Sequence, residues 1–134
     1  MQSLKSRFGL NAGPHAMDRP ELGERSMLGL IAATSPHQLP SFTAALDAAI
    51  SQWMSKAKDE SFGGLEQELA RLHALKSVTS ALGSAEVTLA CDALSDCLRS
   101  GTEAYAVRRR ACALALSAQR LLHRATTYFR MEGG

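Results

Sequence analysis

Apolar residues recur at intervals of three and four positions along most of the chain, which is the period of one buried face of an α-helix. The pattern predicts five helices, over about 18–34, 41–58, 65–82, 85–100 and 103–129. No stretch alternates between apolar and polar residues with the two-residue period of a half-buried strand. Ala and Leu, which favour helices, dominate over Val, Ile and Tyr. The sequence therefore predicts an all-α fold.

Turn and cap signals separate the predicted helices. Asp18 precedes an Arg-Pro-Glu triplet, which combines a capping side chain, an early proline and an acidic first turn. Two prolines in the segment 35–40 and the Phe-Gly-Gly triplet before Leu65 interrupt the pattern ahead of the second and third helices. Gly83 can adopt the left-handed conformation that ends a helix, and Ser84 can cap the next helix.

One face of each long helix is predicted to be buried. The residues on these faces are Phe42, Leu46, Ile50 or Ala49, and Trp53 in the second helix, Leu65, Leu72, Leu75, Thr79 and Leu82 in the third, and Val87, Leu89 or Ala90, Leu94 and Leu98 in the fourth. Short connections between long helices are typical of an antiparallel four-helix bundle, and the first helix is expected to be an additional short N-terminal cap. Residues 1–17 show no sustained period and are interpreted as a flexible lead-in or linker, which leaves 18–134 for the bundle domain.

Charge and composition exclude several functional classes. A net charge of +2 over 134 residues provides no global basic field for nucleic acid. The densest basic run, Arg108–Arg110, is interpreted as a solvated face with one stem packed along the core. No segment approaches the roughly 18–20 apolar residues that span a bilayer, and the first residues lack the apolar region of a secretory signal. Cys91, Cys97 and Cys112 fit no metal-ligand spacing and are odd in number, which indicates a reducing, cytoplasmic location.

His73 lies outside the predicted core face of the third helix. At about 100° per residue, the centre of that face is about 130° away, so the imidazole is expected to be exposed. Lys76 follows one helical turn later, where its ammonium group would lie near any anion held by the imidazole. The other residues on this flank are Glu66, Leu69, Ala70, Ser77 and Ser80, and several of them are short.

This combination of groups suits phosphoryl transfer. A neutral imidazole is a good nucleophile near pH 7, and an adjacent cation stabilises the oxygens of a phosphoryl group in transfer. Spacing alone leaves a purely structural role for His73 open, because a lone helical histidine near a lysine is common. His15, His37 and His123 lie in the lead-in, in a proline-bounded loop and on a solvated or boundary face beside arginines, and no role is assigned to them.

The segment HALKSVTSALGS, residues 73–84, resembles the signature of histidine-containing phosphotransfer (Hpt) domains. That signature consists of a histidine, an apolar residue, a lysine, several small residues and then an apolar-glycine pair. The matching positions here are His73, Leu75, Lys76, Ser77, Ser80, Leu82 and Gly83. The resemblance extends over about 70–102, and the order of predicted helices over about 20–130 agrees with the fold of the family.

The resemblance implies an intermediate of a multistep two-component phosphorelay. His73 would accept a phosphoryl group on Nε2 from a receiver-domain aspartate and pass it to another receiver. Lys76 would help to hold the phosphoryl oxygens. Ser77 and Ser80 would leave the surface around His73 free of large side chains, and Gly83 would permit the turn to the next helix. Such a chain has no kinase activity and no cofactor of its own, because Mg²⁺ and the other catalytic groups belong to the receiver.

The sequence departs from the family pattern at two positions. Ser77 replaces the usual glycine after the lysine, and Ser95, next to Asp96, stands where the family often has Glu or Gln. The docking surface is expected on the exposed sides of the second and third helices around His73. It comprises Leu69, Ala70, Ser77 and Ser80, of which Leu69 and Ala70 could meet an apolar patch of the receiver. Leu69 can equally be interpreted as the edge of the core.

The expected partners are the receiver domains of a hybrid sensor kinase and of a response regulator. The chain is expected to contact them as a monomer. Neither nucleic acid binding nor a membrane span is expected of this chain. The chain would be free-standing or the tail end of a membrane-bound hybrid kinase, and a chemotaxis-kinase phosphotransfer domain belongs to the same family. The main alternative is a helical interaction module without chemistry. A third possibility is an adaptor that dimerises through the last helix, which contains Leu114, Leu116, Leu121 and Leu122.

Overall fold

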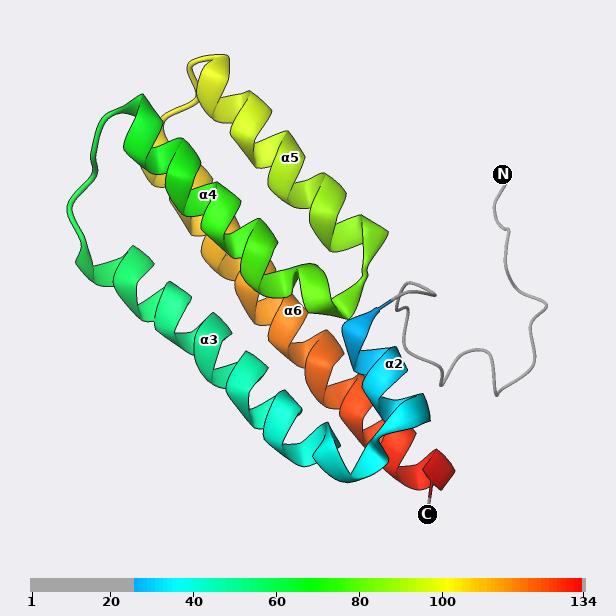
Figure 1. Cartoon of the computed structure of the whole chain (residues 1–134). Coiled ribbons are helices and arrows are strands. Elements are labelled where there is room, and N and C mark those ends of the chain that lie inside the picture. Colours follow the sequence, from blue (N-terminus) through cyan, green and yellow to red (C-terminus); the bar gives the residue numbers. More distant parts are fainter. Residues whose placement is uncertain (1–25, 134) are drawn as a thin grey trace, which may run out of the picture.

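The computed structural model describes residues 26–133, and over these residues the chain is all-α, which confirms the predicted class (Figure 1). The α-helices are α2 (Met27–Thr34), α3 (Leu39–Asp59), α4 (Leu65–Thr79), α5 (Ala85–Arg99) and α6 (Ala104–Gly133). Two short 3₁₀ helices, η1 (Pro36–Gln38) and η2 (Ser80–Leu82), precede α3 and follow α4. None of the described helices combines the length and the apolar character needed to cross a membrane.

The first described helix begins later than the sequence predicted. Ser26 has an extended backbone, and its Oγ accepts a hydrogen bond from the backbone N of Gly29 at 2.9 Å. Ser26 is therefore the N-cap of α2, and one continuous helix from Asp18 to Thr34 is wrong, because the backbone of Ser26 is not helical. The predicted start at Asp18 and the predicted lead-in 1–17 lie outside the described residues.

Helices α3 and α6 are longer than predicted. Pro40 lies in the first turn of α3, where the missing N–H of a proline costs no helical hydrogen bond. The predicted interruption at 35–40 is therefore reduced to Ser35 and the three residues of η1. At the other end of the chain, α6 runs to Gly133 instead of stopping near Phe129.

The turn between α4 and α5 follows its local signals. The last predicted turn of the third helix is the 3₁₀ helix η2, after which Gly83 has the left-handed φ of 63°. Ser84 caps α5 by accepting a hydrogen bond from the backbone N of Val87 at 3.2 Å, as predicted. A Cβ atom added at Gly83 would lie 2.8 Å from the Cβ of Ser26, so the start of α2 packs directly against this turn.

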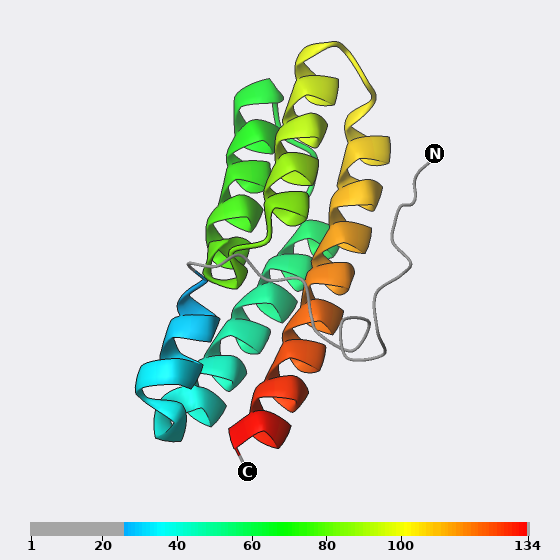
Figure 2. The ribbon, with the colours of Figure 1, turned by 90° about the vertical axis from the view of Figure 1, so that its right-hand side faces the viewer.

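The four long helices lie side by side (Figures 1 and 2). Helix α4 packs against α3 and α5, and α6 packs against α3 and α5 on the other side. Helix α2 contacts α3, η1 and η2, at the end of the molecule where α3 begins (Figure 2). The largest side chains that are fully buried between these elements are Leu28, Ile50, Leu75, Leu82, Cys91, Val107 and Leu122.

Most of the predicted inward residues are buried. These residues are Leu46, Ile50, Trp53, Leu72, Leu75, Thr79, Leu82, Val87, Leu94 and Leu98, whereas Phe42 is half-buried. Leu65 and Leu89 are exceptions, with 50% and 67% of the residue exposed. Leu65 is the first residue of α4, beside an exposed loop, and Leu89 lies on the opposite side of α5 from Val87. Cys91 occupies the inward position on α5 instead.

The arginine run contains one buried member. Arg108 is 8% exposed, and its guanidinium donates to Glu68 Oε2 at 2.7 Å and to the carbonyl oxygens of Ala57 and Glu60 at 3.0 and 2.6 Å. Arg109 and Arg110 are exposed. The predicted solvated face with one inward arginine is therefore correct, but the charged head is buried along with the stem. The carboxylate of Glu68, which the sequence did not single out, makes this burial possible.

Candidate functional site

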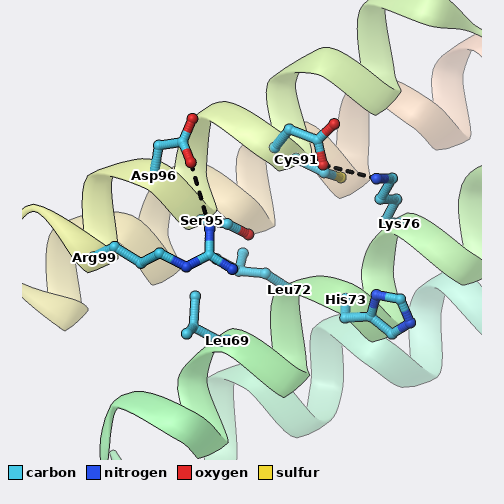
Figure 3. Close-up of a pocket in the computed structure, with 9 residues that line it drawn as sticks. Leu69, Leu72, His73, Lys76, Cys91, Ser95, Asp96 and Arg99 are labelled. Atoms are coloured by element: carbon cyan, nitrogen blue, oxygen red, sulfur yellow. Dashed lines mark hydrogen bonds and ion pairs between the residues drawn. The ribbon is translucent and has the colours of Figure 1, made fainter.

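His73 lies on the exposed flank of α4, as the helical pattern predicted. Leu72 and Leu75 on the same helix are 3% and 0% exposed. Their burial fixes the rotation of α4 about its axis and directs the flank that carries His73 towards solvent. Figure 3 shows the imidazole projecting from α4 one turn away from Lys76.

A groove of about 270 Å³ runs between α4 and α5 beside His73 (Figure 3). Its residues are Leu69, Leu72, His73 and Lys76 from α4, and Cys91, Asp92, Ser95, Asp96 and Arg99 from α5. We refer to it as the α4–α5 groove. The imidazole therefore stands at the edge of a depression with walls from two neighbouring helices.

Lys76 is already engaged across this groove. Its Nζ donates to Asp92 Oδ1 at 2.8 Å, and the two side chains are 40% and 50% exposed. The sequence placed an ammonium group one turn from His73, and the structure places a carboxylate next to that ammonium. Asp92 therefore offsets part of the positive charge that Lys76 presents to an approaching anion.

The wall formed by α5 carries a second ion pair. Arg99 Nη1 lies 3.4 Å from Asp96 Oδ1, with both side chains mostly exposed. Ser95 is half-buried and lines the groove at the position where the related family often has an acid or amide. Cys91 forms part of the floor, and its burial raises the pKa of its thiol. Each cation of the groove thus has a carboxylate partner within the same groove.

The small residues around His73 lie as predicted on an exposed surface. Ser77 and Ser80 are exposed, and Ser80 Oγ donates to the backbone carbonyl oxygen of Ser77 at 2.7 Å. The hydroxyl of Ser80 is therefore used within its own helix turn and is not directed at a ligand. Gly83 belongs to the turn after η2, where it has the structural role that the sequence predicted.

Two of the predicted docking residues, Leu69 and Ala70, lie on opposite sides of His73. Leu69 is half-buried, packs against the core and lines the α4–α5 groove. Ala70 is exposed and lines a second groove, between α3 and α4. The residues of this α3–α4 groove are Ala49, Gln52, Trp53, Lys56, Glu60, Gln67, Ala70, Arg71, Ala74 and Val78. His73 therefore stands on a ridge between two depressions.

Sequence reasoning missed Asp92 and Arg99. Asp92, Asp96 and Arg99 recur at intervals of three and four residues, so they form one polar stripe on α5. A helical projection of α5 would have revealed that stripe. It would not have shown which residue of α4 the stripe faces, because that depends on the packing of the two helices.

The arrangement offers a nucleophile and a nearby cation. An exposed neutral imidazole can attack an electrophilic phosphorus centre, and an ammonium group can offset the charge on phosphoryl oxygens. Within residues 26–133 there is no group of three or more His, Cys, Asp or Glu side chains that could hold a metal ion. Comparison with family models, with curated proteins and with solved structures finds no match for this chain.

Proposed function

We propose that this chain is a phosphorelay intermediate of the Hpt type, in which His73 accepts a phosphoryl group from a receiver-domain aspartate and passes it to another receiver. The observation that carries the proposal is the exposed imidazole of His73, one helical turn from the Lys76 ammonium and at the edge of the α4–α5 groove. A histidine that only fills space in a core does not need such access.

The proposed transfer uses no group of this chain other than the imidazole and its surroundings. The Nε2 lone pair of His73 attacks the phosphorus of an aspartyl phosphate, and Nδ1 keeps its proton. The bond from phosphorus to the carboxyl oxygen breaks, and its electron pair remains on the receiver carboxylate. In the second step another receiver carboxylate attacks phosphorus, and the electron pair of the P–N bond returns to Nε2. The receiver would supply Mg²⁺ and the remaining catalytic groups.

The packing of the helices supports this proposal by placing His73 on a rigid element. We interpret α3, α4, α5 and α6 as an antiparallel four-helix bundle with α2 as its cap, on which the receiver docks over the exposed sides of α3 and α4. The receivers of a hybrid sensor kinase and of a response regulator are the proposed donor and acceptor. The chain would act between them as a cytoplasmic monomer.

A second candidate function is a helical interaction module without chemistry. It is favoured by the engagement of Lys76 with Asp92, which leaves the ammonium occupied in the absence of a phosphoryl group. The α3–α4 groove offers such a module a binding surface, since Ala70 and Ala74 are exposed along it. The dimerising adaptor has less support, because Leu121 and Leu122 are buried in the core and only Leu116 of its four leucines is exposed.

Phosphotransfer from isolated receivers tests the proposal directly. Receiver domains carrying radiolabelled aspartyl phosphate are incubated with the native chain, with His73→Gln and with His123→Gln. His123 is an exposed histidine on α6, so its replacement is a matched control. Label that resists base and is lost in acid is expected on the native chain and on His123→Gln, and should be missing from His73→Gln.

Two results would reject the relay. One is the absence of label on the native chain with a panel of receivers, although circular dichroism shows a folded helical protein. The other is label that persists in His73→Gln, which would place the acceptor elsewhere. Either result would leave the helical interaction module as the better proposal.

A further inference from the structure

The ion pair between Lys76 and Asp92 joins α4 to α5 within the α4–α5 groove. The Nζ–Oδ1 distance is 2.8 Å, which is that of a charge-assisted hydrogen bond. Lys76 is also the residue one helical turn after His73, on the side of α4 that faces α5 (Figure 3). The cation one helical turn after the imidazole is therefore held by a carboxylate from a different helix.

The other acid of this groove has a different partner. Asp96 lies one turn after Asp92 on α5 and pairs with Arg99 at 3.4 Å. Removal of Asp96 would leave the contact between Lys76 and Asp92 in place. The two acids therefore form a natural pair for comparison, with the same charge on the same helix and different cations.

We propose that Asp92 is a positioning residue that sequesters the Lys76 ammonium and thereby restrains phosphorylation of His73. The proposal rests on the phosphotransfer function proposed above. A phosphoryl group on His73 carries anionic oxygens that compete with the Asp92 carboxylate for the same ammonium. If Lys76 turns to the phosphoryl group, Asp92 loses its partner and faces another anion. If Lys76 stays on Asp92, the carboxylate offsets part of its charge, and the ammonium stabilises the phosphoryl oxygens less.

The chemical consequence is a phosphohistidine that forms slowly and is readily given up. Such a group suits a relay, because an intermediate that held its phosphoryl group too strongly would not pass it on. Replacement of Asp92 by Asn keeps the size of the side chain and removes its charge. The ammonium, no longer offset by a carboxylate, can then stabilise the phosphoryl oxygens as they approach, so the reaction at His73 should accelerate.

Phosphoramidate is a probe that needs no receiver. The Nε2 lone pair of His73 attacks its phosphorus, the P–N bond of the reagent breaks, and the nitrogen leaves as ammonia with the electron pair. Rates at individual histidines are followed by NMR of the imidazole signals or by mass spectrometry of peptides. The exposed His37 in η1 serves as the internal standard for reagent and pH.

The expected result is a rate at His73 about two- to fivefold higher in Asp92→Asn than in the native chain, which is the range of an exposed ion pair. Asp96→Asn should change this rate less, because it leaves Lys76 paired. In a Lys76→Ala background, Asp92→Asn should have no more effect than Asp96→Asn. This dependence on Lys76 distinguishes positioning from a general effect of charge or of folding.

The inference and the proposed function fail in different ways. Equal rates at His73 in the native chain and in Asp92→Asn would overturn the role of Asp92, as would an acceleration that persists without Lys76. Neither of these results would affect the receiver experiment with His73→Gln. A negative receiver experiment would instead reject the relay, whatever the phosphoramidate rates are.

Discussion

The buried ion pair between Glu68 and Arg108 permits a quantitative test of how α4 and α6 are held together. Glu68 is 5% exposed, and its Oε2 accepts hydrogen bonds from Arg108 Nη2 at 2.7 Å and from the backbone N of Gly63 at 2.9 Å. Glu68→Gln keeps the shape of the side chain and removes its charge. We expect it to lower the free energy of unfolding by about 3 kcal/mol.

The magnitude follows from what remains around Arg108. A buried cation that loses its anionic partner typically costs about 3–5 kcal/mol. The carbonyl oxygens of Ala57 and Glu60 still accept from the guanidinium, which places the cost at the lower end of that range. Arg108→Met should cost a similar amount, because it leaves a buried carboxylate and removes the hydrogen bonds to these carbonyls.

The double variant measures the coupling free energy between Glu68 and Arg108. With both charges removed, neither is left unpaired, so Glu68→Gln with Arg108→Met should cost at least 2 kcal/mol less than the sum of the two single changes. Urea unfolding can be followed by the fluorescence of Trp53, the single tryptophan of the chain. Its indole N–H donates to the backbone carbonyl oxygen of Arg71 on α4 at 2.9 Å.

A surface pair provides the control. Asp96→Asn breaks the exposed pair with Arg99 and should cost less than about 0.5 kcal/mol. A cost of Glu68→Gln no larger than that of this control would show that the ion pair is not held in a buried environment, as would a double variant whose cost equals the sum of the two single changes.

Three further predictions concern the turn after η2, a buried thiol and an exposed carboxylate. Gly83→Ala should lower the free energy of unfolding by about 2 kcal/mol in urea titrations, because φ is 63° and the new Cβ would lie 2.8 Å from the Cβ of Ser26. Cys91 should be alkylated by iodoacetamide most slowly of the three cysteines in a mass-spectrometric time course, because it is 1% exposed and its burial raises the pKa of the thiol. The hydrogen bond from Arg71 lowers the pKa of Glu60, so this carboxylate stabilises the fold above its unfolded-state pKa and loses that contribution as the pH falls through its folded-state pKa. Glu60→Gln should therefore reduce the pH dependence of stability on the acid side, measured by urea unfolding across that range.

Each of these predictions has a result that contradicts it. Gly101 also has a positive φ, of 98°, but an added Cβ there would have no neighbour within 4 Å, so Gly101→Ala measures the backbone cost alone. A smaller cost for Gly83→Ala than for Gly101→Ala would contradict the contact with Ser26, because φ at Gly101 lies further from the left-handed region that alanine can adopt. Alkylation of Cys91 as fast as that of the other thiols would contradict its burial. An unchanged pH dependence of stability at acidic pH in Glu60→Gln would contradict the stabilising role of the hydrogen bond from Arg71.

The candidate site was predictable only in part. The exposure of His73 followed from the positions of Leu72 and Leu75, because rotation about a helix axis is set by the residues of that helix. The ion pair of Lys76 could not be predicted in this way, since its partner Asp92 lies on another helix. The sequence therefore located the imidazole and the ammonium but not the carboxylate that competes for the ammonium.

The sequence by itself determined the helical class, most inward faces and the local turn chemistry at Gly83 and Ser84. These features depend on residues within about one or two helical turns of one another, and such interactions are present in the linear pattern. The tertiary structure alone decided that Arg108 is buried against Glu68 and that Lys76 meets Asp92 across a groove. The physical reason is that a charge can be buried or sequestered only where another element supplies its partner, and the pairing of elements depends on how whole helix faces pack.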